Sequence, residues 1–167
     1  MTLNIERDQR SSTPELRLAR LGLLLPELPP DPVGNFANAV IAGGLLYLSG
    51  QGPVTADGEL MTGKVGADVS VDIGYKHAQL VGLNLLAVAR RELGALSEIV
   101  RVVKLFGMVN AAPDFADHPQ VINGCSDLMN SAFGERGIHA RSAVGMGSLP
   151  NNITVEIEAI FELGTSR

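Results

Sequence analysis

The chain has 167 residues, of which 46% are hydrophobic and 4% aromatic, and it contains no tryptophan. This length favours one domain, whose core must be built mainly from Leu, Val, Ile and Ala. The net charge of −5 argues against a nucleic-acid partner, because neutralising phosphates requires a clustered positive face. The single cysteine, Cys125, excludes an internal disulfide, and the three histidines lack the spacing of metal ligands, so we expect no metal site.

The first part of the chain is predicted to be an extension. Residues 1–12 are polar, and we expect them to be disordered. Thr13 followed by a proline is typical of a helix start, and several leucines then continue a helical face. The proline-rich stretch 26–32 predicts a linker. We therefore assign residues 1–32 to an N-terminal extension with a short helix and residues 33–167 to the main domain.

Targeting signals are weak. No apolar run approaches the ~20 residues needed to span a bilayer. The leucine-rich segment 21–25 is not followed by the small-residue cleavage site of a secretion signal. Arg and Ser residues near the start resemble a transit peptide, but Glu6, Asp8 and Glu15 weaken that interpretation. We expect a cytoplasmic protein.

The main domain reads as alternating strands and helices. The order β-β-α-β-α-β-β predicts an α+β domain, a mixed sheet with two helices packed on one face. In chain order, we expect a hairpin of strands at 39–41 and 45–49, a long helix from Ser70 to Gly94, and a buried central strand at 99–109. A second helix at 119–133 follows, and then two strands at 140–148 and 153–160 joined by a tight turn.

The segment 49–53, Ser-Gly-Gln-Gly-Pro, ends the second strand. A phosphate-binding loop needs a helix immediately after its glycines, which Pro53 and the following turn residues do not provide. We favour a strand end with unusual backbone dihedrals. An alternative is that free N–H groups of Gly50 and Gln51 bind part of a ligand.

Arg141 begins a strand in which Ala143, Gly145 and Gly147 share its face. Such small residues leave an open shelf for a small molecule, where a guanidinium can bind a carboxylate or a phosphate in a bidentate way. Taken alone, Arg141 is better explained as a surface residue. The two glycines are equally compatible with a bulge and with close approach of a ligand or a second backbone.

Glu156 and Glu158 alternate with apolar residues in the last strand. The simplest interpretation is a half-buried strand whose charged face lies in water. A functional carboxylate at this place would instead orient water or transfer a proton. Cys125 is better explained as a small buried residue than as a nucleophile, because no histidine stands at motif spacing.

The distance between the two charges is informative. If the last two strands form a simple hairpin, Gly145 faces Glu156, and Arg141 lies four residues farther along. That separation is about 13 Å at the usual rise per residue, which is long for two groups acting on a three-carbon substrate. Either the side chains reach across, or the strands do not pair so simply, or one partner comes from a neighbouring subunit. We favour the neighbouring subunit, since the high apolar content also indicates a homo-oligomer.

Four segments together resemble the RidA/YjgF family of reactive intermediate deaminases, and the similarity covers roughly residues 33–163. The extension resembles that of a longer subfamily. The resemblance implies a chorismate-mutase-like fold and a homotrimer with ligand clefts between subunits. It also implies hydrolysis of small enamines and imines of amino-acid metabolism to 2-keto acids and ammonia, without a cofactor. The segments are Leu-Ser-Gly-Gln-Gly-Pro at 48–53, Val-Ile-Asn at 121–123, Ala-Arg-Ser-Ala-Val at 140–144 and Val-Glu-Ile-Glu-Ala-Ile at 155–160.

The resemblance also implies roles for individual residues. Arg141 would hold the substrate carboxylate, and Glu156 would activate the attacking water and assist proton transfer. Three further residues, Ser49, Gly50 and Asn123, would line the cleft. We expect a small carboxylate-bearing metabolite as the ligand, and neither nucleic acid nor a membrane as a partner.

The chain departs from the family pattern at two cleft positions. Phe36 stands where a tyrosine is usual, and Ala143 stands where a cysteine is usual. An alternative function is therefore a non-catalytic trimer that binds small metabolites in a regulatory role. An RNA-cleaving role, reported for some relatives, is disfavoured by the acidic charge.

Overall fold

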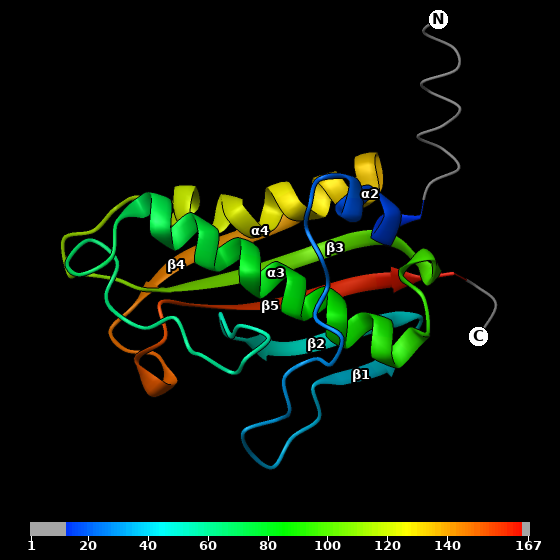
Figure 1. Cartoon of the computed structure of the whole chain (residues 1–167), viewed down its shortest axis with the longest axis horizontal. Coiled ribbons are helices and arrows are strands. Elements are labelled where there is room, and N and C mark those ends of the chain that lie inside the picture. The colour runs from blue at the N-terminus through cyan, green and yellow to red at the C-terminus, as the bar shows by residue number, and fades with distance from the viewer. Residues whose placement is uncertain (1–12, 165–167) are drawn as a thin grey trace, which may run out of the picture.

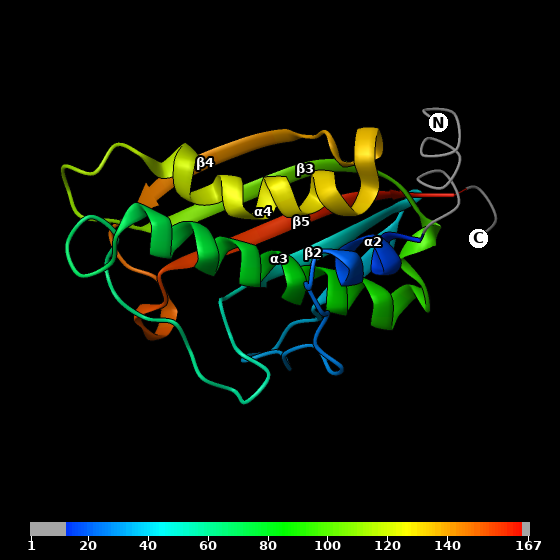
Figure 2. The same cartoon turned by 45° about the horizontal axis from the view of Figure 1, so that its top comes forward.

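The computed structural model describes residues 13–164; the predicted disorder of residues 1–12 lies outside this range. Five strands form one sheet in the order β1-β2-β5-β3-β4, and all three labelled helices lie on the same side of it (Figures 1 and 2). The predicted α+β class, a mixed sheet with two helices packed on one face, is confirmed. The elements are α2 (Pro14–Arg20), β1 (Ala39–Ala42), β2 (Leu45–Gln51), α3 (Val71–Leu93), β3 (Ile99–Asn110), α4 (His118–Phe133), β4 (Ala140–Met146) and β5 (Val155–Leu163), with short 3-10 turns at Leu96–Glu98, Gly134–Gly137 and Pro150–Asn152.

The long helix α3 is bounded as its sequence predicts. The Ser70 side chain accepts a hydrogen bond of 3.3 Å from the backbone N–H of Ile73, and Gly94 ends the helix with a φ of 86°. Glycines let α3 and α4 approach closely. A Cβ at Gly82 would lie 2.5 Å from the Leu128 side chain, and one at Gly124 would overlap the Tyr75 carbonyl. No helix in the described part of the chain is long and apolar enough to cross a membrane.

The first two strands form the expected hairpin. Ala42 pairs with Leu45 across the turn, where Gly43 and Gly44 have φ values of 58° and 76°. The helix α4 then connects β3 to β4, and these two strands are parallel, as a strand–helix–strand crossover requires.

The prediction that β4 and β5 form a hairpin is wrong. β3 lies between them, parallel to β4 and antiparallel to β5. The connecting loop passes around the end of β3, where the Asn110 side chain donates 2.9 Å to the Asn152 side chain and the Asn110 N–H donates 2.9 Å to the Thr154 carbonyl. Asn151 and Asn152, both with positive φ (53° and 56°), make this reversal possible.

The two faces of the sheet differ. The main hydrophobic core fills the space between the sheet and the helices, with Leu46, Leu105 and Phe161 fully buried. The opposite face has no helix over it among the described residues (Figure 2). It carries a small separate cluster around Met108, Leu149 and Ile153.

The helix α2, predicted within the extension, packs at one end of α4 (Figure 1). Thr13 caps it, as expected, by accepting from the N–H of Leu16, and Leu18 is fully buried in the main core. The Glu15 carboxylate accepts a 2.8 Å hydrogen bond from the N–H of Leu96. The proline-rich stretch lies beside α3, where Arg90 donates 2.6 Å to the Pro26 carbonyl.

Candidate functional site

Arg141 lies on the edge strand β4, on the face that α4 covers. It pairs with Leu105 of β3, a buried core residue, so both side chains point toward the helices. The guanidinium donates from Nη1 to Asn123 Oδ1 at 2.8 Å and to Ser126 Oγ at 2.9 Å. Its Nη2 donates 3.3 Å to the Pro119 carbonyl. Three groups from one helix therefore fix the guanidinium.

These bonds leave two donors for a ligand. A guanidinium has five N–H groups. Both Nη1 hydrogens and one Nη2 hydrogen of Arg141 are used, so the Nε hydrogen and one Nη2 hydrogen have no partner among residues 13–164. Two donors on one planar group suit the two oxygens of a carboxylate. Because the side chain is half-buried, such a bond would be only partly screened by water.

The expected open shelf beside Arg141 is wrong. Ala143 packs against the main core, and the His118 ring lies where a side chain at Gly145 would stand. The register of β4 along β3 is continuous, so Gly145 marks no bulge. The absence of a side chain at Gly145 instead lets another group approach the strand closely, and that group is the His118 side chain of α4. A Cβ at Gly147, in contrast, would meet no other atom within 4 Å among the described residues.

Glu156 lies on β5 and faces away from the helices. It is half-buried, and its carboxylate has no hydrogen-bond or ion-pair partner in the described part of the chain. Burial raises the pKa of Glu156, and the neighbouring negative charge of Glu158 raises it further. The alternation is as predicted, since Val155 and Ile157 are buried whereas Glu158 is exposed. A carboxyl group with a raised pKa is suited to proton transfer near neutral pH.

Ser49 and Gly50 form a bulge beside Glu156. Leu48 pairs with Ala159 and Gln51 with Ile157, so two residues of β2 stand opposite one residue of β5. Neither Gly50 nor Gly52 has a positive φ, so the predicted unusual dihedrals are wrong in that respect. Gly50 instead provides space, because a Cβ there would overlap the Glu156 carboxylate.

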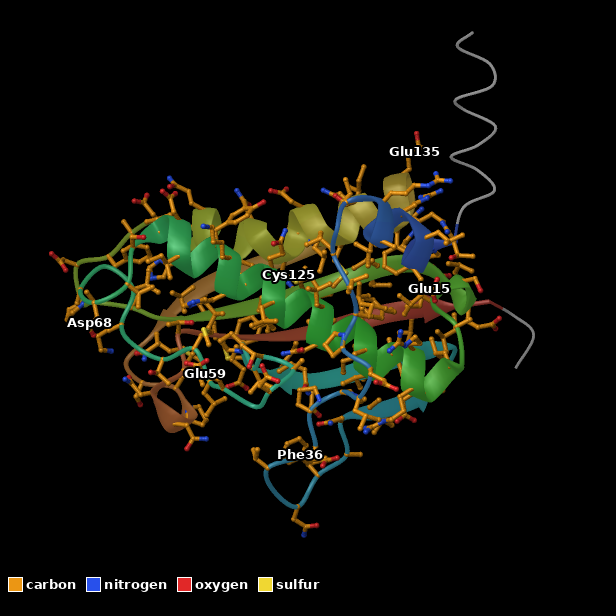
Figure 3. The ribbon with its side chains drawn as sticks, viewed as in Figure 1. Glu15, Phe36, Glu59, Asp68, Cys125 and Glu135 are labelled. Atoms are coloured by element: carbon orange, nitrogen blue, oxygen red, sulfur yellow. The ribbon has the colours of Figure 1, made fainter. Side chains whose placement is uncertain are left out.

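Phe36 lies on the loop that precedes β1 (Figure 3) and is 45% exposed. The next residue, Ala37, is tied to the bulge, because the Ser49 hydroxyl donates 2.8 Å to its carbonyl. Apart from Ala143, which packs against the main core, the predicted site residues therefore fall into two groups. We call Asn123 and Arg141, with Ser126, the arginine group, and we call Ser49, Gly50 and Glu156, with Phe36 nearby, the glutamate group.

The two groups lie on opposite faces of the sheet. Arg141 pairs with Leu105, whereas Glu156 pairs with Met108, three residues along β3. Side chains three positions apart on a strand point to opposite faces. The second of the three explanations for the long separation, that the strands do not pair as a simple hairpin, is thus correct. Within one chain, the sheet separates the guanidinium from the carboxylate.

The sequence reasoning missed Ser126, His139 and the Pro119 carbonyl. Ser126 lies three residues after Asn123 on one helical face, and His139 lies two residues before Arg141, so helix and strand spacing were the available signals. Cys125 is buried between α3 and α4 (Figure 3), and burial raises the pKa of its thiol to about 12, as expected for a structural cysteine. No cluster of three or more His, Cys, Asp or Glu side chains within residues 13–164 could hold a metal ion.

The fold and the two groups define a small α+β protein. It has an arginine with free donors at a sheet edge and, on the other face, a half-buried carboxyl group without a partner among residues 13–164. Residues 15–163 match the family described as "YjgF/chorismate_mutase-like, putative endoribonuclease". The chain therefore belongs to the RidA/YjgF family.

The chain is also similar to individual proteins. The chain is 42% identical over 147 residues to Protein TCP17 of Trypanosoma cruzi, covering 87% of this chain and 91% of that protein. It is 32% identical over 134 residues to a 2-iminobutanoate/2-iminopropanoate deaminase of Dermatophagoides farinae, covering 80% and 89%. The crystal structure of Atu1372 from Agrobacterium tumefaciens, a protein of unknown function, superimposes with a TM-score of 0.83 at 44% identity, covering 91% and 94%.

Proposed function

We propose that this protein hydrolyses small imines and enamines derived from amino acids to 2-keto acids and ammonia. The observation that carries the proposal is the pair of Arg141, held with two free donors, and Glu156, half-buried with a raised pKa and no partner among the described residues. The similarity to a protein named as an imine deaminase supports the same chemistry.

The reaction makes modest demands on the protein. Arg141 binds the carboxylate of a substrate such as 2-iminopropanoate and fixes the imine carbon in place. Glu156 as carboxylate accepts a proton from water while the water oxygen bonds to that carbon and the C=N π electrons move to nitrogen. The protonated Glu156 returns the proton to nitrogen, which gives an aminoalcohol. Glu156 then transfers the hydroxyl proton to the amine nitrogen, the C=O bond forms as the C–N bond breaks, and pyruvate and ammonia leave. For an enamine, the protonated form first donates to the β-carbon.

We propose that the complete site forms between subunits of a homotrimer located in the cytoplasm. The opposite-face placement of the two groups supports this arrangement, because one small molecule cannot reach both sides of its own sheet. The arginine group lies at the edge strand β4, where a neighbouring chain can approach, and the glutamate group lies on the face without helices. A three-fold arrangement would bring the arginine group of one chain to the glutamate group of the next.

The second candidate is a non-catalytic metabolite-binding trimer. Ala143 favours it, because the position two residues after the arginine carries no thiol and packs into the core. The two free N–H donors of Arg141 would then bind the carboxylate of keto or hydroxy acids without turnover.

An assay of imine hydrolysis separates the two candidates. An amino-acid oxidase generates imines in situ from a range of amino acids, and released keto acid and ammonia are measured. We expect the protein to accelerate the release of keto acid and ammonia. Arg141→Ala should lower kcat/KM at least tenfold, because it removes a pair of hydrogen bonds to the charged substrate carboxylate. Absence of acceleration with every amino acid, or full activity in Arg141→Ala, would contradict the proposal. Ligand-dependent thermal shifts without turnover would support the second candidate.

A further inference from the structure

A series of hydrogen bonds, which we call the relay, extends from Arg141 on the side away from its two free donors. Arg141 Nη1 lies 2.9 Å from Ser126 Oγ, and Ser126 Oγ lies 3.0 Å from His139 Nε2. The other ring nitrogen, His139 Nδ1, lies 2.6 Å from the Gly137 carbonyl oxygen. The relay thus links α4, β4 and the 3-10 turn that precedes β4.

The chemistry of each group fixes the direction of every bond. The Gly137 carbonyl only accepts, so His139 Nδ1 carries a hydrogen and donates it. The Arg141 guanidinium only donates, so Ser126 Oγ accepts from it. The single hydroxyl hydrogen of Ser126 is then available to His139 Nε2, which accepts when the ring is neutral. The order is Arg141 to Ser126 to His139, with His139 donating in turn to Gly137.

The residues of the relay are held in place by packing. Ser126 is only 8% exposed, so it has little alternative contact with water. Gly137 is fixed against the end of α4, because a Cβ there would overlap the Met129 carbonyl. The His139 ring is half-buried, and its pKa is lowered by burial and by the charge of Arg141, against the opposing effect of the Gly137 hydrogen bond. A neutral ring is the form that this geometry needs.

We propose that Ser126 and neutral His139 are positioning residues that orient the Arg141 guanidinium for carboxylate binding. This inference rests on the proposed function for its ligand class, but its geometry can be tested without turnover. With both Nη1 hydrogens taken by Ser126 and Asn123, rotation of the guanidinium is stopped, and the Nε hydrogen and the second Nη2 hydrogen stay available to the ligand. Pre-orientation of this kind lowers the entropy that binding must overcome.

NMR tests the direction of the bonds. Long-range ¹⁵N–¹H spectra of the full chain at pH 8 report which nitrogen of the His139 ring carries hydrogen. We expect the Nδ1–H tautomer, and the Nε2–H tautomer would overturn the relay. The Arg141 Nη signals, which separate only when rotation about the Cζ–N bond is slow, should be resolved in the native protein and merge in Ser126→Ala and His139→Leu. Signals that stay resolved in both variants would also overturn it.

Matched variants test the role in binding, with pyruvate as the probe in calorimetric titrations. We expect Ser126→Ala and His139→Leu to weaken pyruvate binding about tenfold. Ser126→Ala removes a hydrogen bond from the charged guanidinium, and His139→Leu removes the acceptor that orients the Ser126 hydroxyl. His139→Gln should restore binding to within about threefold, since its amide can accept from Ser126 and donate to Gly137.

The control is His77→Leu, which removes a comparable bond of 3.0 Å between His77 Nδ1 and the Thr154 hydroxyl elsewhere in the protein. It should leave pyruvate affinity and the Arg141 signals unchanged. Equal pyruvate affinity in His139→Leu and the native protein, or equal loss in His139→Gln and His139→Leu, would refute the relay. An intact relay in a protein that binds pyruvate but never releases keto acid would instead refute only the deaminase function.

Discussion

Gly50 connects a local backbone irregularity to the chemistry of Glu156. The bulge turns Gly50 toward the carboxyl group, and a Cβ at this position would overlap it. The overlapping atoms belong to the end of a flexible side chain, which can move without disturbing the backbone. A larger residue at position 50 therefore displaces the carboxyl group more than it unfolds the protein.

Gly50→Ala should accordingly separate activity from stability. We expect kcat to fall at least tenfold, because misplacement of a proton-transfer group by about an ångström has effects of this size. The free energy of unfolding should change by less than about 1 kcal/mol. Steady-state kinetics and urea unfolding measure the two effects. Gly147→Ala, with open space around its Cβ position, is the matched control and should change neither. A fully active Gly50→Ala variant would contradict the placement of Glu156 at the reacting atoms.

The raised pKa of Glu156 has a consequence for stability. An acid whose pKa is higher in the folded state than in the unfolded state, near 4.5, binds more protons when folded. Stability therefore falls as pH rises through the interval between these two pKa values, and the loss persists at higher pH. Ionised Glu156 therefore destabilises the fold. Such a loss of stability is common at functional positions and agrees with the role that we propose for Glu156.

Glu156→Gln should remove this cost, because an amide never ionises. We expect the variant to be more stable than the native protein at pH 7 and equally stable at about pH 3.5, where the native carboxyl group is protonated in both states. Urea unfolding at the two pH values tests this. Glu162→Gln, an exposed position on the same strand, should show no such pH-dependent gain. A Glu156→Gln variant that loses stability on going from pH 3.5 to pH 7 relative to the native protein would contradict the burial argument.

At the scale of elements, α2 is joined to the domain by a buried contact. Leu18 is fully buried in the main core, whereas Leu16 on the same helix is 54% exposed. We expect Leu18→Ala to lower the free energy of unfolding by about 2–4 kcal/mol through lost burial and a cavity. Leu16→Ala should cost less than about 0.5 kcal/mol. Denaturant unfolding measures both, and equal small effects would show that α2 contributes nothing to the stability of the fold.

Most elements could be predicted from the sequence because their signals are local. Ser70 and Gly94 bound α3, and the glycine pair 43–44 defines the first hairpin. The prediction for the last two strands was wrong, because a turn signal says that the chain reverses and does not say which strands become neighbours. Insertion of β3 between β4 and β5 rests on pairing between residues far apart in the sequence, which local patterns do not reveal.

The candidate site was also predicted only in part, because the sequence does not show which elements lie over one another. Arg141 and Asn123 lie together, and Gly50 adjoins Glu156, whereas the prediction that these residues line one cleft stays a prediction. The open shelf was not found, because the pattern of small residues in β4 cannot show that α4 lies over them. His139 was passed over because its partner, Ser126, lies on another element.

At the scale of the whole molecule, one sheet divides the two groups. Arg141 lies on the helix-covered face of the edge strand β4, and Glu156 lies on the face without helices. A three-carbon imino acid cannot contact both within one chain. Our central claim is therefore that the active site is shared, with the arginine group of one subunit facing the glutamate group of the next.

Subunit complementation tests this claim most directly. Arg141→Ala and Glu156→Gln chains, each expected to be inactive alone, are unfolded together at equal concentration, refolded and assayed for imine hydrolysis. In a cyclic trimer with shared sites, every mixed trimer contains one intact site, so about a quarter of native activity should return. Re-mixing the two variants without unfolding is the control and should restore nothing if subunits do not exchange. No recovery in correctly assembled mixed trimers would contradict a shared site and return both groups to a single chain.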